Sequence, residues 1–258
     1  MLRPRFIPCL LVRKKGLVKT VKFGETKYVG DPINAVKIFN EKEADELIVL
    51  DIDASANGSE PDFALIQKLA AECRMPLCYG GGIKTVAQAR RIIALGVEKV
   101  AISSAFLAEP QLIAAIAQEI GSQSVVVVLD VKRSLFGKYE VYAHNGRKGT
   151  GKTPVELAAL AEQMGAGEVV INSIDLDGQM KGYDLDLAQK VRAAIGLPMS
   201  VLGGAGTLAD IGQLIKACGV VGAAAGSMFV FKGSYRAVLI NYPTVVERDS
   251  LIRSALPI

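Results

Sequence analysis

The sequence contains no tryptophan, only one histidine, His144, and four cysteines in 258 residues. One imidazole cannot supply the histidine clusters on which many zinc sites and acid–base pairs depend. We expect His144 to be an ordinary loop residue, because it stands in a polar stretch. The cysteines lack zinc-ligand spacing, so we expect reduced, mostly buried thiols and neither a metal nor another cofactor. They are Cys9, Cys73, Cys78 and Cys218.

Long apolar runs and a strong charge of one sign are also missing. No hydrophobic run approaches the ~20 residues that cross a bilayer, and the first residues lack the pattern of a signal peptide. We therefore predict a cytoplasmic protein with no membrane contact. The formal net charge of +4 permits an anionic small substrate. It is too small and too diffuse to indicate nucleic-acid binding.

Short apolar segments alternate with longer amphipathic ones along the whole chain. Eight segments are rich in Val and Ile and apolar on both faces, as parallel strands under helices must be. They cover residues 5–12, 46–52, 76–79, 98–103, 124–130, 168–173, 198–202 and 222–225. Helical patterns begin at residue 31 and cover 61–73, 85–95, 110–120, 154–164, 184–195 and 208–217. Eight βα units of ~32 residues predict one single-domain (β/α)8 TIM barrel over residues 1–258.

The two halves of the chain resemble one another. Residues 76–82 return as 198–204, residues 103–106 return as 226–229, and residues 50–53 return as 174–177. An open doubly wound sheet, the alternative fold, gives no reason for this match. We therefore predict two duplicated half-barrels. When the two halves are aligned from their first strands, Leu11 corresponds to Asp130. Only the second half therefore carries a carboxylate at that position.

Glycine-rich turns follow the third and seventh predicted strands, and serine follows the next strand in each half. In such barrels the chemistry lies at the carboxyl ends of the strands. Exposed backbone N–H groups there can hold a phosphate, although tight turns alone would also explain the glycines. Two symmetric cradles predict a phosphorylated small molecule with a phosphate at each end. Their residues are Gly81, Gly82, Ser103 and Ser104, and Gly204, Gly206, Gly226 and Ser227.

Asp130 ends the fifth strand and is the candidate general acid or base. An ion pair with Lys132 or Arg133 is the alternative for this carboxylate. The segment after the first strand is basic, and both a solvated surface loop and a mobile lid over an anionic substrate fit it. Its cations are Arg13, Lys14, Lys15, Lys19, Lys22 and Lys27.

Residues 146–153 match the P-loop pattern G-x-x-x-x-G-K-[ST] letter for letter. A functional P-loop follows a buried apolar strand and opens a helix. Here the preceding residues, 138–144, alternate polar and apolar types, which is typical of an exposed hairpin. The pattern therefore does not favour nucleotide hydrolysis.

Taken together, the motifs resemble the cyclase subunit of imidazole glycerol phosphate synthase, the HisF family of histidine biosynthesis. The resemblance covers essentially the whole chain. Its marks are Ile7-Pro8-Cys9-Leu10, Gly30-Asp31-Pro32, Asp45-Glu46-Leu47, Leu50-Asp51-Ile52, Gly80-Gly81-Gly82-Ile83, Gly121-Ser122-Gln123, Asp130-Val131-Lys132-Arg133, Gly165-Ala166-Gly167-Glu168, Ser173-Ile174-Asp175, Asp177-Gly178 and Gly203-Gly204-Ala205-Gly206. It implies a half-barrel-duplicated barrel that binds a bisphosphorylated ribulosyl-aminoimidazole carboxamide nucleotide.

The resemblance also implies roles for residues outside the cradles. Substrate-binding positions match Lys19, Asn172, Asp177 and Gly178. The family docks a glutaminase on the amino-terminal face of the barrel, near Glu98, and ammonia travels through the interior to the mouth. The ionic gate of that entrance matches Arg5, Glu46, Lys99 and Glu168, for which ordinary strand-end salt bridges are the alternative.

Several positions depart from the family pattern. Asn172, the pair Ser103-Ser104 and Asn145 differ from the family's polar residues, and the most consequential departure is at the first catalytic aspartate. The family cyclase uses two aspartates, and Leu11 stands where the first is expected. The pattern resembles a divergent branch that accompanies the synthesis of acetamidino sugars in surface polysaccharides. That resemblance implies a barrel that passes ammonia to a separate ATP-dependent sugar amidotransferase. The alternative is a true cyclase, a lyase of histidine biosynthesis, so enzymatic activity of the chain itself stays open.

Overall fold

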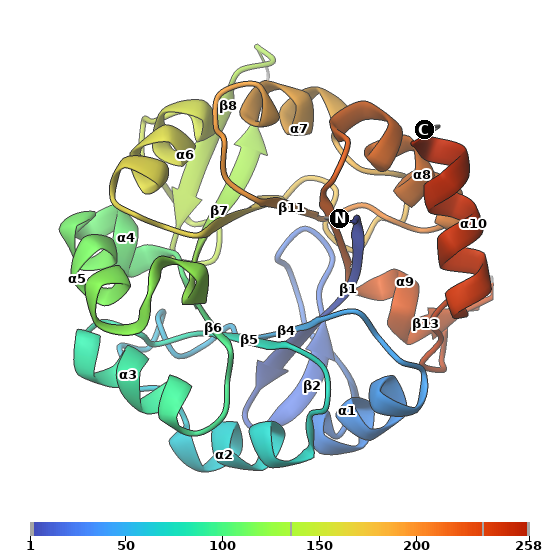
Figure 1. Ribbon diagram of the computed structural model, residues 1–258, viewed down its shortest axis with the longest axis horizontal. Coiled ribbons are helices and arrows are strands. Elements are labelled where there is room, and N and C mark those ends of the chain that lie inside the picture. Colours follow the sequence, from blue (N-terminus) through green and yellow to red (C-terminus); the bar gives the residue numbers. More distant parts are fainter. Residues whose placement is uncertain (1–2, 135, 234, 257–258) are drawn as a thin grey trace.

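Eight parallel strands close into a barrel in the computed structural model, which describes residues 3–134, 136–233 and 235–256 (Figure 1). Going round the barrel, each strand pairs with the next, and β7 pairs with β10 to complete the ring. All eight predicted strands are present. They are β1 (Arg5–Arg13), β4 (Leu47–Asp51), β5 (Leu77–Gly80), β6 (Lys99–Ile102), β7 (Val125–Arg133), β10 (Glu168–Ser173), β11 (Met199–Leu202) and β12 (Gly222–Ala225).

The seven predicted helices surround the strands (Figure 1). The first begins as expected, because Asp31 accepts a hydrogen bond from the backbone of Asn34 and Pro32 occupies the first turn. The seven are α1 (Pro32–Glu41), α2 (Phe63–Glu72), α3 (Val86–Ala94), α5 (Gln111–Ile120), α6 (Pro154–Gln163), α7 (Leu185–Arg192) and α8 (Leu208–Cys218). No helix of the described residues is long and apolar enough to cross a membrane.

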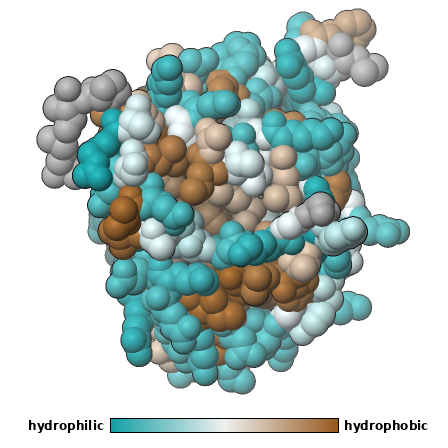
Figure 2. All heavy atoms as spheres, turned by 90° about the vertical axis from the view of Figure 1, so that its right-hand side faces the viewer, coloured by the Kyte–Doolittle hydropathy of each residue, from teal (hydrophilic) through white to brown (hydrophobic). Residues whose placement is uncertain are grey.

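Three further helices were not predicted: α4 (Ser104–Ala108), α9 (Ser227–Val230) and α10 (Val245–Ala255). The first two are too short to show a periodic pattern. α10 lacks an apolar stripe, and its one buried residue is Arg248, which donates to the Glu43 carbonyl and the Tyr242 hydroxyl. The outer face that carries α9 and α10 is mainly hydrophilic, with apolar areas between the charged side chains (Figure 2).

Each half-barrel continues its first strand into an antiparallel hairpin. β1 pairs with β2 (Gly16–Lys19), which pairs with β3 (Lys27–Gly30), so the predicted basic loop is largely an ordered hairpin. β7 pairs with β8 (Tyr139–Ala143), which pairs with β9 (Lys148–Gly149). The P-loop-like segment is thus a hairpin end that leads into the Thr153 cap of α6. The predicted hairpin is present, but Tyr139, Val141 and Ala143 of β8 are buried, so it is not exposed on both faces. A two-stranded sheet of β13 (Phe231–Lys232) and β14 (Ala237–Val238) follows α9.

The register of the strands relates the two halves residue by residue. Cys9 pairs with Ile48 in the first half, and Val128 pairs with Val170 in the second. Continued along the strands, this register makes Leu11 equivalent to Asp130, as predicted, and Leu50 equivalent to Asn172. The sequence match of residues 50–53 with 174–177 is therefore wrong by two residues. Most of the matched residues lie beyond the ends of β4 and β10, where no hydrogen bonds between strands fix the register.

Apolar side chains fill two separate layers. One lies between the strands and the helices, and the other lies inside the barrel. Burial of such surface contributes roughly 25 cal/mol per Å² to folding. The inner layer consists of Ile7, Cys9, Ile48, Cys78, Ala101, Val126, Val128, Val170, Leu202 and Ala224, with Leu11 and Leu50 packed against it. The barrel thus has an apolar interior between its two polar ends.

Candidate functional site

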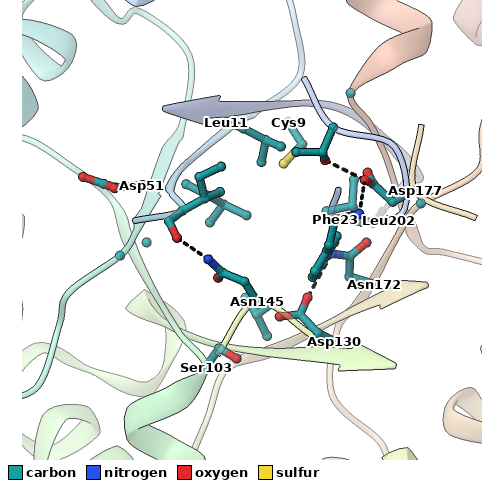
Figure 3. A pocket seen from close by; sticks show the side chains of 18 of the residues that line it. Cys9, Leu11, Phe23, Asp51, Ser103, Asp130, Asn145, Asn172, Asp177 and Leu202 are labelled. Carbon is teal, nitrogen blue, oxygen red and sulfur yellow. Dashed lines mark hydrogen bonds between the residues drawn. The ribbon is translucent and has the colours of Figure 1, made fainter. Parts of the chain in front are cut away.

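A pocket opens at the carboxyl ends of the strands, which we call the mouth (Figure 3). All of the predicted phosphate-binding and catalytic residues line it except Gly206. The N–H of Gly206 donates instead to the Asp210 carboxylate, 2.9 Å away, at the start of α8. The lining residues from the prediction are Lys19, Gly81, Gly82, Ser103, Ser104, Asp130, Asn172, Asp177, Gly178, Gly204, Gly226 and Ser227.

Asp130 is buried at the mouth and accepts a hydrogen bond of 2.9 Å from the Asn172 amide. Burial raises the pKa of Asp130 to about 6, while the Asn172 hydrogen bond lowers it and the charge of Asp177 raises it. No ion pair joins Asp130 to Lys132 or Arg133 among the described side chains, and both cations are exposed. A carboxyl group with a pKa near neutrality suits transfer of a proton.

Leu11 faces this pair from the opposite side of the mouth (Figure 3). It lies beside Leu50 on the neighbouring strand, just as Asp130 lies beside Asn172. The half-barrel symmetry therefore relates an apolar pair to a hydrogen-bonded polar pair. Only the Asp130 side of these two equivalent places can hold or move a proton.

The second-half cradle contains a buried cation. Lys19 donates from Nζ to the Cys9 carbonyl at 2.6 Å, and burial lowers the pKa of Lys19 while the nearby Asp177 raises it. A Cβ placed on Gly226 would lie 2.5 Å from that Nζ. Gly204 has a φ of +107°, and a Cβ there would lie 2.0 Å from the Gly182 carbonyl oxygen. Glycine is therefore required at position 204, and Lys19 stands next to Gly226 of the same cradle.

Asp177 fastens the first hairpin to the mouth. Its Oδ2 accepts from the Thr20 hydroxyl at 2.6 Å and from the Phe23 N–H at 3.3 Å. Burial raises the pKa of Asp177, and the hydrogen bond from Thr20 lowers it. The hydrogen bonds from Thr20 and Phe23 to Asp177 thus hold the first hairpin over the pocket. Thr20 and Phe23 were missed by sequence reasoning, since no pattern fixes where a hairpin folds back.

The first-half cradle has different neighbours. Gly81 and Gly82 have φ values of +125° and +75°, and the Gly82 N–H donates to the Ser55 hydroxyl at 3.2 Å. Asn145 reaches over the mouth from the β8–β9 turn and donates to the Ile52 carbonyl at 2.7 Å (Figure 3). His144, beside it, is an exposed turn residue as expected. The described residues hold no group of histidine, cysteine, aspartate or glutamate arranged for a metal.

Four charged residues meet at the opposite end of the barrel interior, as predicted; we call them the ion ring. Arg5 and Lys99 each bond to both Glu46 and Glu168. Lys99 Nζ lies 2.8 Å from Glu46 and 2.9 Å from Glu168, and Arg5 Nη2 lies 2.7 Å from Glu168. Although burial alone would raise the pKa of Glu168, the charges of Arg5 and Lys99 lower it to about 2. Glu98 lies outside the ring and is exposed.

Ser200 also joins the ring and was missed. Its hydroxyl donates to Glu168 Oε1 at 2.5 Å, and its side chain is fully buried. The available signal was a single serine within the apolar strand β11. Because the ring closes on itself within the barrel, it is more than a set of independent strand-end salt bridges.

Comparisons with known proteins agree with this fold. The profile of the family described as "Histidine biosynthesis protein" matches residues 5–236. A Vibrio vulnificus protein named "Putative imidazole glycerol phosphate synthase subunit hisF3" is 59% identical over 253 residues, 98% of this chain and 97% of that protein. The "Imidazole glycerol phosphate synthase subunit HisF" of Alkaliphilus metalliredigens is 40% identical over 229 residues, 89% of this chain and 91% of that protein.

These matches define the class as histidine-biosynthesis-type (β/α)8 barrels built from two half-barrels. Within that class the chain belongs to the HisF family, in a divergent branch whose members include the Vibrio protein. A Pseudomonas aeruginosa protein whose printed name ends in "subunit hisF2" is 51% identical over 249 residues, 96% of this chain and 99% of that protein.

Proposed function

We propose that this chain is a cytoplasmic barrel subunit that receives ammonia from a glutaminase and conducts it to the mouth. The single observation that carries the proposal is the contrast between the two ends of the interior. The ion ring keeps all four of its charged members. At the mouth, Leu11 leaves Asp130 without an acidic partner at the equivalent place.

The proposed path follows β1 from the ion ring to the mouth. Leu11 lies six residues after Arg5 on β1, which corresponds to about 16 Å along the axis of a barrel with tilted strands. Of the side chains between them, Ile7 and Cys9 belong to the apolar inner layer, whereas Phe6 and Leu10 pack in the outer layer. An apolar interior disfavours the charged ammonium ion and admits neutral ammonia at much lower cost. The ring would exclude ions at the entrance, and Glu98 would lie at the glutaminase contact.

At the mouth, ammonia would pass to a separate ATP-dependent sugar amidotransferase. Delivery of ammonia needs no proton-transfer pair, whereas loss of a general acid or base typically costs about 10²–10⁴ in rate. A phosphorylated ligand would bind at Lys19 and the glycines of the second-half cradle, where backbone and cation can act together. The names of the relatives support a synthase-type barrel subunit and do not specify the acceptor.

A true cyclase is the second candidate function. It is favoured by Asp130, whose raised pKa of about 6 suits acid–base work, and by the two glycine cradles at one mouth. The cyclase would need another group, such as Asp51 or Asp177, in place of the missing carboxylate. Both aspartates line the pocket.

The proposal is tested by reconstituting the barrel, a glutaminase and the amidotransferase with amide-¹⁵N glutamine and excess unlabelled ammonium. We expect the sugar product to carry ¹⁵N well above the isotope fraction of the bulk ammonia. Product nitrogen equal to the bulk pool would reject a conduit. Imidazole formation from the bisphosphorylated nucleotide in the same mixture would favour the cyclase.

A further inference from the structure

The two glutamates of the ion ring are symmetry equivalents with different neighbours. Glu46 lies two residues before Ile48, which pairs with Cys78, and Glu168 lies two residues before Val170, which pairs with Ser200. Cys78 and Ser200 therefore hold the same place in the two halves. The half-barrel duplication sets a thiol beside one glutamate and a hydroxyl beside the other.

Ser200 gives Glu168 an extra bond. Glu168 Oε1 accepts from Ser200 Oγ at 2.5 Å and from Arg5 Nη2 at 2.7 Å, and Oε2 accepts from Lys99 at 2.9 Å. Glu46 accepts from Arg5 and Lys99 only, and the described bonds include none from Cys78. A hydroxyl bond to an ionised carboxylate is among the stronger hydrogen bonds, whereas a thiol is a weak donor.

The packing around Ser200 leaves space for its hydroxyl group, because the neighbouring residue on β12 is a glycine. Gly222 of β12 pairs with Ser200 on one side and with Arg5 on the other. A Cβ on Gly222 would lie 1.9 Å from Ser200 Oγ, so the strand between serine and arginine must lack a side chain at this level. Ser200 therefore also comes within 3.4 Å of Arg5 Nη2.

We propose that Ser200 is a positioning residue that fixes Glu168, so that the ion ring opens by release of Glu46. The opening step rests on the proposed function, in which ammonia must pass the ring. Fixed by Ser200 and Arg5, Glu168 keeps its place while Glu46 separates from Lys99 and Arg5. The passage then forms on the β4–β5 side, next to Cys78.

The test compares the mobility of the two glutamate side chains at neutral pH in the barrel alone. Deuterium relaxation of their Cγ methylenes gives an order parameter for each. We expect a higher value for Glu168 than for Glu46 in the native chain. Ser200→Ala should lower the Glu168 value to that of Glu46, and Ser200→Thr should preserve it. Cys78→Ser, the matched change in the other half, should raise the value of Glu46.

Equal order parameters in the native chain, or no response of Glu168 to Ser200→Ala, would overturn the positioning role. Thermal unfolding of each variant shows whether the barrel remains folded, and the threonine variant separates the hydroxyl from side-chain volume. In the reconstituted complex, Cys78→Ser should lower glutamine-dependent transfer about tenfold and leave ammonium-dependent transfer unchanged. If the order parameters respond as expected and this transfer does not, Ser200 keeps its positioning role and opening by release of Glu46 is rejected. Failure of the conduit itself shows separately, as product nitrogen equal to the bulk pool in the ¹⁵N experiment.

Discussion

Leu11 and Asp130 occupy equivalent positions on the first strands of the two half-barrels and face each other across the mouth. The equivalence extends to their neighbours, since Leu50 corresponds to Asn172. The backbone at the mouth is therefore symmetric between the two halves, whereas a carboxylate occupies only one of these two equivalent positions. A reaction that needs a proton donor and a proton acceptor on opposite sides would lack one of them here.

Restoring the missing carboxylate tests this reading. Leu11→Asp should raise ammonium-dependent cyclisation of the bisphosphorylated nucleotide by about 10² or more, because it supplies a second acid–base group. The rate is measured by formation of the imidazole product. Leu11→Asn is the matched control and should give no gain, since it adds a polar group that does not titrate. An unchanged rate for Leu11→Asp would indicate that another residue already replaces the aspartate.

Asp130 should make the fold less stable at neutral pH. Its pKa in the folded protein, about 6, lies above the ordinary value of about 3.9 for an unfolded aspartate. The ionised form is therefore disfavoured by folding, and stability falls as the pH rises from about 4 to about 6. Asp130→Asn should raise the free energy of unfolding at pH 7 by about 1–3 kcal/mol, since one pKa unit corresponds to about 1.4 kcal/mol. Urea unfolding at pH 4 and pH 7 checks this, and a loss of stability at pH 7 would contradict it.

Glu168 should behave in the opposite way. Its folded pKa of about 2 lies below the ordinary 4.5, so its contribution is present above pH 4.5 and is lost as the pH falls toward 2. Glu168→Gln leaves buried cations unbalanced and should cost about 3–5 kcal/mol. Glu98→Gln, at an exposed acidic position near the same end, is the control and should stay within ~0.5 kcal/mol of the native chain. Equal effects of the two substitutions in urea unfolding would argue against a buried ring.

Gly204 should not tolerate a side chain. Its positive φ and the 2.0 Å approach to the Gly182 carbonyl predict a large cost for Gly204→Ala. Gly219→Ala is the matched control, because Gly219 has a φ of +73° and nothing within 4 Å of its Cβ position. The control should cost only the ~1–2 kcal/mol of left-handed backbone. Thermal unfolding should separate the two variants by several degrees, with Gly204→Ala the less stable.

The sequence predicted the barrel well because its strands are apolar on both faces and its halves repeat. The family resemblance grouped Arg5, Glu46, Lys99 and Glu168 correctly, and their positions at the starts of predicted strands agree with one shared end of the barrel. Other features depended on tertiary contacts. The bond of Ser200 to Glu168 requires a gap at Gly222, and α10 is attached through Arg248 instead of an apolar stripe. Neither contact can be recognised from the order and spacing of residues in the sequence.

The most direct measurement of the central claim uses the native barrel with ammonium salts and the bisphosphorylated ribulosyl-aminoimidazole carboxamide nucleotide. The position equivalent to Asp130 in the first half holds Leu11 and therefore no carboxylate. We expect the native chain to close the ring at least about 10²-fold more slowly than Leu11→Asp under the same conditions. Ring closure by the native chain as fast as by Leu11→Asp would contradict the account.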